Sequence, residues 1–256
     1  MSLTQKEIKQ IPKSYDIVGD ILIFSDFPKE LKKKEKEVGN YLLKRIKQAK
    51  VITKKSKFYS GTKRTPKLKI LAGENRKETM HKENGLLMKL NPEKAYFSAR
   101  TGTERLRVSR LVKKNETVLV MFSGIAPFAL NISKHSKAKE IYGVEINRAA
   151  HKYGEQNLKI NKIRNIHLFR GNVKRVLPKI NKKFDRIIMP LPKNSEDFLE
   201  LALKYLKPKG KIHIYIFEHE RDFSKLKQKY KKFKPKIIKA GSPSPGKYRV
   251  CLELQT

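Results

Sequence analysis

The sequence predicts an α/β fold in which a mainly parallel sheet carries helices on both faces, preceded by a small α+β module. The first observation is an alternation of short apolar runs and helical stretches from residue 117 onward. Such alternation is typical of parallel sheets, because a crossover helix connects each strand to the next. The second observation is that the runs IIM and IHIYIF are mainly apolar. Strands buried on both sides have this composition.

The second part of the chain should contain strands and helices in turn. We expect helices at residues 126–134, 148–160, 195–206 and 222–231. We expect strands at residues 117–121, 140–144, 166–170, 185–189, 211–216, 237–240 and 248–254, with only a short turn between the third and the fourth. The alternation of the two types of segment predicts a single sheet.

The first part of the chain has a different pattern, with strand-like pieces separated by Gly, Pro and Asn. Two short pieces meet at Gly19, and a helix with an apolar stripe follows at residues 28–48. Thr103 can cap a short helix at residues 104–112, and the remaining strands are expected at residues 51–59, 67–72, 85–90 and 95–98. We therefore expect an α+β module at residues 1–112 and a cofactor-binding domain at residues 113–256.

The composition predicts a polyanionic partner. The chain has 61 Lys and Arg against 24 Asp and Glu, a net charge of +37. Nucleic acid and an anionic membrane surface are the candidate partners. Nucleic acid is favoured over a mere compositional bias, because acidic residues are not enriched alongside the lysines. No apolar run is long enough to span a bilayer, and the N-terminus has no apolar signal core. The single cysteine, Cys251, allows no internal disulfide, which predicts a cytoplasmic protein.

The stretch TVLVMFSGIAPFAL, residues 117–130, predicts a cofactor site. A buried strand turns through Ser123 and Gly124 into a helix with Pro127 in its first turn. About 20 residues later, Glu145 ends the next strand and can accept hydrogen bonds from both ribose hydroxyls of an adenosine. An ordinary strand-to-helix turn remains the alternative for this stretch taken alone. A dinucleotide would need more glycines at the turn, so S-adenosylmethionine, which has no phosphate, fits better.

Several segments resemble one family, the archaeal and eukaryotic-type tRNA guanine-N1 methyltransferases that modify position 37. They are MFSGIAPFAL, VEIN, IIMPLPKNSEDFL, GKIHIYIF, LAGENRKETMHKENG and YFSARTGTER. The resemblance implies a class I, Rossmann-like methyltransferase that acts as a monomer on the anticodon region of tRNA, with no membrane or DNA partner. Residues 1–112 would then support RNA binding and catalysis. Longer family members carry an extra N-terminal domain, which this chain is expected to lack. The implied S-adenosylmethionine ligands are Phe122, Ser123, Gly124, Ile125, Ala126, Glu145, Ile146, Asn172 and Val173.

The resemblance also implies catalytic residues. Guanine N1 bears a proton that must leave, and electron density moves toward O6, so a general base and a cation are needed. By resemblance Glu104 is the base and Arg64 the cation, with the adjacent Lys63 as an alternative. Tyr96 and Arg100 would line the same pocket. Without the resemblance, Glu104 would be an ordinary acidic residue in the first turn of a helix.

Three positions depart from the family's pattern: Val120 and Asn172 stand where Asp is usual, and Pro190 stands where Asn is usual. Proline offers neither a side-chain donor nor an N–H, so Lys193 or Asn194 could take over the contact with the base. The alternatives are therefore methylation of a wyosine intermediate at the same position, alone or as a second activity, and a non-catalytic RNA-binding protein. A branch that transfers an aminocarboxypropyl group lacks the Thr-Glu-Arg base, which argues against that reaction.

Overall fold

The computed structural model describes residues 3–60, 65–190 and 195–256 and divides the chain into two compact units, Met1–Ala99 and Arg100–Thr256. Helix α3 (Gly102–Arg110) belongs to the second unit, where it packs against α4 (Pro127–His135). The expected boundary at residue 112 places α3 in the first module instead, because a sequence pattern does not show which neighbour a helix packs against. No described helix has the length and apolar character needed to cross a membrane.

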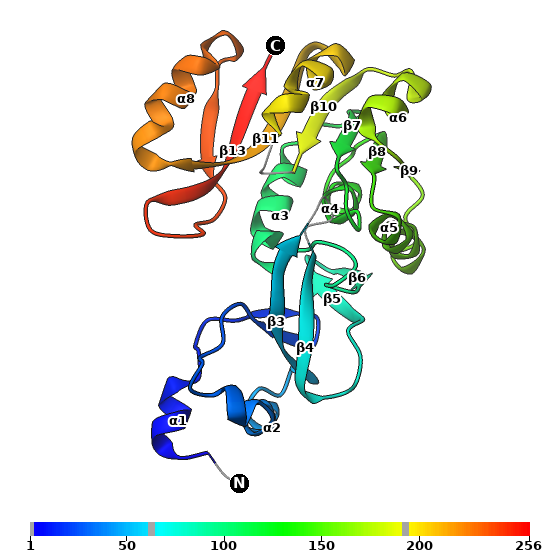
Figure 1. Ribbon diagram of the computed structural model, residues 1–256. Coiled ribbons are helices and arrows are strands. Elements are labelled where there is room, and N and C mark those ends of the chain that lie inside the picture. The colour runs from blue at the N-terminus through cyan, green and yellow to red at the C-terminus, as the bar shows by residue number, and fades with distance from the viewer. Residues whose placement is uncertain (1–2, 61–64, 191–194) are drawn as a thin grey trace. The chain divides into compact units, whose positions relative to one another are not determined.

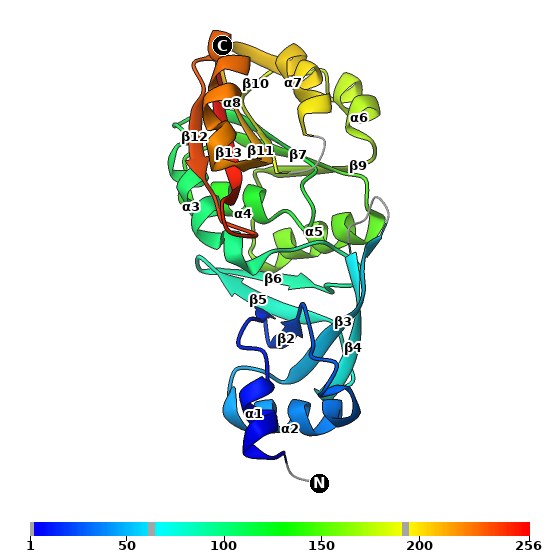
Figure 2. The same cartoon turned by 60° about the vertical axis from the view of Figure 1, so that its left-hand side comes forward.

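The first unit is a small α+β module, as expected. Strands β1 to β4 form one sheet in sequential order, with β2 parallel to β3 and the other pairs antiparallel. The long β3 and β4 lie side by side in Figure 2, and β5 pairs with β6 in a separate hairpin. The elements are α1 (Gln5–Gln10), β1 (Asp16–Val18), β2 (Ile21–Phe24), η1 (Lys32–Lys34), α2 (Glu35–Arg45), β3 (Val51–Ser60), β4 (Thr65–Gly73), β5 (Thr79–Glu83) and β6 (Leu86–Leu90).

The first unit differs from the expectation in three places. Strand β5 was not expected, because the polar sequence TMHKE lacks a clear apolar alternation; the turn at Asn84 and Gly85, both in the left-handed region, pairs it with β6. Residues 95–98, expected as a strand, have no regular secondary structure. Helix α2 is also shorter than the stretch 28–48, because a 3-10 turn precedes it.

The second unit contains one seven-stranded sheet with the order β12-β13-β11-β10-β7-β8-β9. Figure 1 labels the strands from β13 to β9, and Figure 2 labels β12. Neighbours from β11 to β9 are parallel, whereas β13 is antiparallel to both β11 and β12. The strands are β7 (Thr117–Met121), β8 (Glu140–Glu145), β9 (Ile166–Arg170), β10 (Phe184–Met189), β11 (Leu206–His219), β12 (Lys236–Lys239) and β13 (Lys247–Gln255). The predicted α/β fold with a mainly parallel sheet is confirmed.

Helices cover both faces of this sheet. The core cluster on one face includes alternate strand residues such as Ile212, Ile214 and Ile216, together with side chains from α6 (Val173–Ile180), α7 (Leu199–Tyr205) and α8 (Phe223–Lys229). The opposite face carries α3, α4 and α5 (Arg148–Ile160). His213 and Tyr215 alternate with the isoleucines of β11 and therefore point toward α3.

Helix α6 replaces the short turn expected between β9 and β10. Its apolar residues recur at helical spacing, and Leu177 is fully buried in the core. Pro178 hides the helix in the sequence, because proline inside a helix removes a backbone donor. Here the helix ends two residues later at Ile180, so few hydrogen bonds depend on that position.

Candidate active site

The residues predicted to hold the cofactor come together at the carboxyl ends of β7, β8 and β9. These strands are adjacent and parallel, so the loops that follow them meet at one edge of the sheet. The loop after β7, residues 122–126, uses the left-handed region at Phe122 (φ 58°), Gly124 (φ 59°) and Ala126 (φ 70°). Two of these residues carry a Cβ, which costs about 1 kcal/mol or more at each. The loop therefore holds a conformation that its own residue preferences oppose.

Neighbouring groups hold the loop in this conformation. The Ser123 N–H donates to the carbonyl oxygen of Val144 at 2.9 Å, and the Ala126 N–H donates to that of Ser123 at 2.9 Å. The side-chain amide of Asn157 donates to the carbonyl oxygen of Ile125 at 3.2 Å. These bonds fix the path of the backbone from the strand into α4.

Glu145 lies at the centre of this edge. Its two carboxylate oxygens accept the backbone N–H groups of Gly124 and Asn147, both at 2.7 Å. Burial raises the pKa of this carboxyl group above its ordinary value of 4.5, although the backbone donors oppose the shift. Each carboxylate oxygen has two lone pairs, so acceptor capacity remains for ribose hydroxyls after the backbone is satisfied.

The other predicted ligands divide into exposed and buried groups. Ile146, directly after β8, is 59% exposed, which is unusual for an aliphatic side chain and suits an adenine ring lying on it. Val173 is buried. Asn172 caps α6, because its side-chain oxygen accepts the Lys174 N–H at 2.9 Å. Phe122 packs edge-on against Phe198 with ring centroids 4.9 Å apart, so it offers the cofactor loop its backbone rather than its ring.

The start of α4 suits the cofactor's carboxylate. Proline occupies the first turn of the helix, and no side chain caps the end at Ala126. The remaining free amides and the helix dipole favour an anion at this position. Together with the buried acceptor at Glu145 and the exposed Ile146, these groups fit S-adenosylmethionine.

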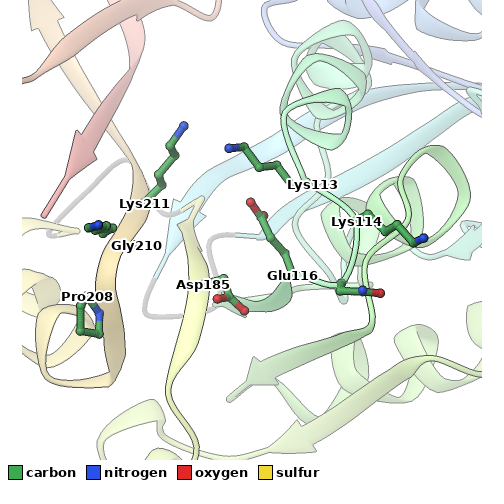
Figure 3. Close-up of a pocket in the computed structure, with 9 residues that line it drawn as sticks. Lys113, Lys114, Glu116, Asp185, Pro208, Gly210 and Lys211 are labelled. Carbon is green, nitrogen blue, oxygen red and sulfur yellow. The ribbon is translucent and has the colours of Figure 1, made fainter.

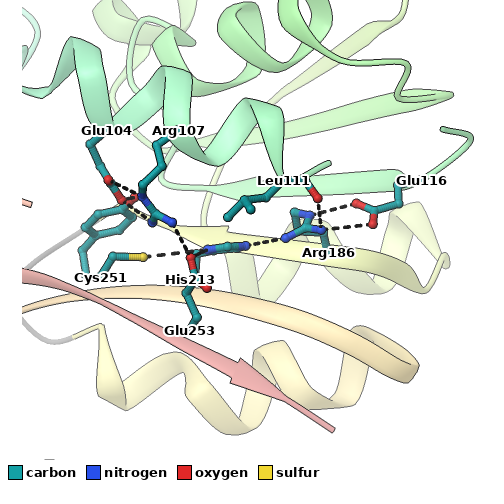
Figure 4. A network of polar contacts seen from close by, with 9 residues as sticks. Glu104, Arg107, Leu111, Glu116, Arg186, His213, Cys251 and Glu253 are labelled. Atoms are coloured by element: carbon teal, nitrogen blue, oxygen red, sulfur yellow. Dashed lines mark hydrogen bonds and ion pairs between the residues drawn. The ribbon is translucent and has the colours of Figure 1, made fainter. Parts of the chain in front are cut away.

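Glu104, the predicted base, lies in the first turn of α3 and is buried, with 7% of the residue exposed. Its carboxylate accepts two hydrogen bonds from Arg107, at 2.7 Å from Nε and 2.8 Å from Nη2 (Figure 4). A third comes from the hydroxyl of Tyr215 at 2.6 Å. Burial holds the pKa of Tyr215 well above its usual value, so its hydroxyl stays a donor. Glu104 is thus fixed in position by side chains from its own helix and from β11.

Strand register places this carboxylate at the same edge of the sheet as the cofactor loops. Met189, the last residue of β10, pairs with Ile214 of β11. Tyr215 therefore lies level with Pro190, the half-buried residue that follows β10. Since Tyr215 contacts Glu104, the carboxylate predicted as the general base lies near the carboxyl end of β10. By resemblance, the target guanine binds at this same end of the strand.

Behind Glu104, a row of charged and polar side chains continues along the face of the sheet that α3 covers (Figure 4). Arg107 also donates to Glu253 at 2.6 Å, and the Nδ1 atom of His213 lies 3.4 Å from the same carboxylate. The Nε2 atom of His213 lies 2.6 Å from Arg186, which in turn binds Glu116 at 2.8 and 3.0 Å. This row connects the site to the amino-terminal edge of the sheet.

The protonation states of the row follow from its contacts. Burial lowers the pKa of His213, so the ring is neutral at neutral pH. Because Arg186 can only donate, Nε2 of His213 is the acceptor and Nδ1 carries the proton. Burial alone would raise the pKa of Glu253, but hydrogen bonds from His213 and Arg107 lower it to about 2.

His213, Cys251 and Glu253 offer three ligand atoms within 4.8 Å of one another, which is a possible metal site. The surroundings do not fit a cation. Both nitrogens of His213 are engaged, one of them with Arg186, and Arg107 occupies Glu253. Burial also raises the pKa of the Cys251 thiol, whereas a metal ligand must be a thiolate. We therefore assign this cluster to the support of Glu104.

The remaining predicted residues have simpler surroundings. Tyr96 lies in the first unit with 42% of its surface exposed, and Arg100 is an exposed residue at the start of the second. Arg64, its alternative Lys63, and Lys193 with its neighbour Asn194 lie outside the described residues. Val120, where the family usually has Asp, is a fully buried residue of β7.

A cavity of about 330 Å³ lies at the opposite, amino-terminal edge of the sheet and is unrelated to this site (Figure 3). Its two carboxylates are already bound within the protein. Glu116 pairs with Arg186, while Asp185 binds Lys207 at 2.9 Å and the Thr117 N–H at 2.8 Å. Ligands of open α/β sheets bind at the carboxyl ends of the strands, so this cavity is not our candidate active site. Its lining residues are Lys113, Lys114, Asn115, Glu116, Asp185, Pro208, Lys209, Gly210 and Lys211.

The residues that surround Glu104 are not among those predicted from the sequence. Tyr215 and His213 were included in an apolar strand, although their polar groups alternate with isoleucine in IHIYIF. That alternation indicates a polar face of the strand and was the available signal. Arg107 stands three residues after Glu104, a spacing that brings side chains together on a helix.

The sheet order, the glycine turn and the buried acidic residue at the end of the second parallel strand define a class I methyltransferase. Comparison with known proteins then gives the family. A sequence model described as the TRM5/TYW2 methyltransferase domain matches residues 79–239, and one described as the TYW2 N-terminal domain matches residues 1–76. The chain belongs to the TRM5/TYW2 methyltransferase family, which confirms the predicted membership and cofactor class.

Three relatives show the range of activities in this family. The tRNA (guanine(37)-N(1))-methyltransferase Trm5b of Pyrococcus abyssi is 35% identical over 100% of this chain and 78% of its own length. The tRNA (guanine(37)-N(1))/4-demethylwyosine(37)-methyltransferase Taw22 of Nanoarchaeum equitans is 35% identical over 85% and 87%. A tRNA(Phe) (4-demethylwyosine(37)-C(7)) aminocarboxypropyltransferase of Methanocaldococcus jannaschii is 32% identical over 93% and 96%.

Solved structures agree with the fold. Trm5b from Pyrococcus abyssi superimposes with a TM-score of 0.83 at 34% identity, over 99% of this chain and 78% of that one. The structure of aTrm5 in complex with tRNALeu gives 0.82 at 32% identity, over 97% and 73%. TYW2 of M. jannaschii in complex with AdoMet gives 0.68 at 27% identity, over 94% and 98%.

Proposed function

We propose that this protein transfers the methyl group of S-adenosylmethionine to N1 of guanine at position 37 of tRNA. The observation that carries the proposal is the buried carboxylate of Glu104, held by Arg107 and Tyr215 beside the carboxyl end of β10. The names of the Trm5b relatives support the same reaction. We further propose that the protein acts as a cytoplasmic monomer on the anticodon region of tRNA, which the charge of +37 and the tRNA complex of aTrm5 support.

In this mechanism Glu104 removes the N1 proton. The carboxylate has about four acceptor sites, and its three observed hydrogen bonds leave one, on the oxygen that faces only Arg107 Nε. That oxygen can accept the guanine N1–H without losing an existing partner. When bound, S-adenosylmethionine supplies an electrophilic methyl group on a sulfonium centre.

Charge stabilisation completes the proposal. As the proton moves to Glu104, electron density shifts toward O6 of the base, and a cation near this oxygen lowers the barrier. By resemblance Arg64 has this role, while Tyr96, Arg100, Pro190 and Lys193 contact the substrate. Phe122 to Ala126, Glu145, Ile146, Asn172 and Val173 are proposed to bind the cofactor.

Methylation of a wyosine intermediate is the second candidate. Residues 1–76 match the TYW2 N-terminal domain, and Taw22 carries both activities in its name. Pro190 adds to this case, because it removes the side-chain amide that the family's pattern offers to guanine. Glu104 argues against the aminocarboxypropyl transfer in the name of the third relative. By resemblance, the branch that performs this transfer lacks the Thr-Glu-Arg base.

Methyl transfer to matched transcripts tests the proposal. We expect radiolabelled methyl incorporation into a tRNA transcript with G37 and into its I37 form, which keeps the N1–H and O6, but not into the A37 form. Mass spectrometry of the digested product should place the methyl group on N1. Incorporation only into tRNA that carries a wyosine intermediate would replace the main proposal by the second candidate. Binding of S-adenosylmethionine without transfer to any tRNA would favour the non-catalytic alternative.

A further inference from the structure

Arg249 of β13 is a buried cation that has no counter-ion among the described residues. The residue is 8% exposed, and its Nε atom is enclosed without a hydrogen-bond partner. Among the residues that the structure describes, no carboxylate pairs with it. The guanidinium group lies over the ring of Tyr215 in a cation–π contact, with its central carbon 5.1 Å from the ring centroid.

Other buried arginines of this unit are paired. Arg186 binds Glu116 through two nitrogens and also donates to the carbonyl oxygen of Leu111 at 2.7 Å. Arg105 donates to the hydroxyl of Thr101 at 2.6 Å. Removing a guanidinium from water without such partners costs several kcal/mol. A buried arginine that lacks them is therefore expected to have a partner that is absent from the free protein.

The position of Arg249 indicates what that partner is. Arg249 and Glu104 both contact Tyr215, one through the ring face and the other through the hydroxyl, yet they form no ion pair with each other. Arg249 pairs in register with Phe217 of β11, a ring that is 40% exposed on the same face of the sheet. A proton acceptor, a cationic donor and an exposed aromatic ring thus lie together at the carboxyl end of β11.

We propose that Arg249 donates a hydrogen bond to O6 of the target guanine while Glu104 accepts the N1 proton. N1 and O6 are adjacent on one edge of the base, so a carboxylate and a guanidinium that do not touch can each reach one of them at about 3 Å. Phe217 offers a surface on which the splayed base can stack. The inference rests on the proposed function and adds a second cation to the role that the resemblance gives to Arg64.

The proposed step moves one proton and one methyl group. The N1–H proton moves to Glu104, and its bonding pair stays on the ring, with negative charge shared between N1 and O6. The Arg249 guanidinium stabilises the share on O6. N1 then forms the new bond to the methyl carbon, and the electron pair of the broken carbon–sulfur bond remains on sulfur.

Single-turnover kinetics of Arg249→Gln at saturating S-adenosylmethionine and saturating G37 transcript test this role. We expect the rate constant to fall by about 10²- to 10³-fold, the usual loss when one donor to a developing oxyanion is removed. Affinities for tRNA and for S-adenosylmethionine should change by less than about threefold. The rate should also keep rising to higher pH than in the wild type, because N1 deprotonation becomes harder without the cation. Arg249→Lys should restore part of the rate.

Arg164→Gln is the matched control, since it removes the same charge from an exposed residue. Arg164 precedes β9, which is the edge strand at the other end of the strand order from β12 and β13. A wild-type rate in Arg249→Gln would overturn the inference. So would a tRNA affinity that falls while the saturated rate stays unchanged, which would make Arg249 a phosphate contact, or a lost melting transition in both Arg249 variants, which would make it structural. If the wild type itself methylates no G37 transcript, the proposed function fails instead.

Discussion

The two halves of the candidate active site are built in different ways. Around the cofactor loops, the contacts come mainly from the backbone: amide groups of Gly124 and Asn147 bind Glu145, and left-handed residues shape the turn. Around Glu104, side chains from α3, β11 and β13 make the contacts. A backbone-built site depends on chain conformation, whereas a side-chain-built site depends on residue identity, so substitutions should affect the two halves differently.

The largest effect is expected in the side-chain-built half, from Glu104→Gln. The amide cannot accept the N1 proton, and its NH₂ group would face the donors Arg107 and Tyr215. We expect single-turnover methyl transfer to fall by about 10³-fold or more, within the range attributed to general bases. The affinity for tRNA, measured by filter binding, should stay within about threefold of that of the wild type.

Glu220→Gln is a suitable control, because Glu220 is an acidic residue of the η4 turn (Glu220–Asp222) that pairs with Lys239 across the surface. Its rate should match the wild type. If Glu104→Gln retained a wild-type rate, Glu104 would be only a structural partner of Arg107, and the difference between the two halves would lose its functional meaning.

The same difference explains how far the sequence predicts this protein. Strand ends and turn residues are local features, so the spacing of Gly124 and Glu145 is enough to predict the cofactor edge. The surroundings of Glu104 come from residues more than 100 positions away, such as Tyr215 and Glu253. No local pattern reports that register, and the family resemblance predicts Glu104 as the base without indicating its partners. Helix α6 was missed for a local reason, because Pro178 obscures its apolar stripe.

A smaller effect is expected at Glu145, where protonation should weaken cofactor binding. Burial raises the pKa of this carboxyl group above 4.5, so the group takes up a proton at a higher pH than an exposed glutamate. The protonated form loses acceptor capacity for the ribose hydroxyls. Calorimetry should therefore show S-adenosylmethionine binding about tenfold more weakly as the pH falls from neutral toward 4.5, with little change above neutrality.

The linkage has the opposite sign for folding. Because the folded-state pKa is raised, the contribution of Glu145 to folding stability is present below about pH 4.5 and is lost as the pH rises through the folded-state pKa.

For cofactor binding, Glu145→Gln should remove the pH dependence between neutrality and pH 4.5. Glu140→Gln, at the other end of β8, should retain it. An unchanged pH profile in Glu145→Gln would show that another group controls the cofactor site.

The smallest effect, and the clearest test of a backbone-built half, is expected from Ala126→Gly. Ala126 has φ 70°, a conformation that costs alanine about 1 kcal/mol or more and glycine almost nothing. Glycine also makes the unfolded chain more flexible, which offsets part of this gain. We expect a net stabilisation of about 0.5 kcal/mol, seen as a melting temperature higher by about 1–2 °C. Ala129→Gly, inside α4, should instead lower it, because Ala129 is helical and glycine is disfavoured in a helix. Both alanines are fully buried, so the loss of the methyl group is common to the two variants. Equal losses in both variants would mean that the Ala126 side chain, rather than the path of the backbone, stabilises the loop.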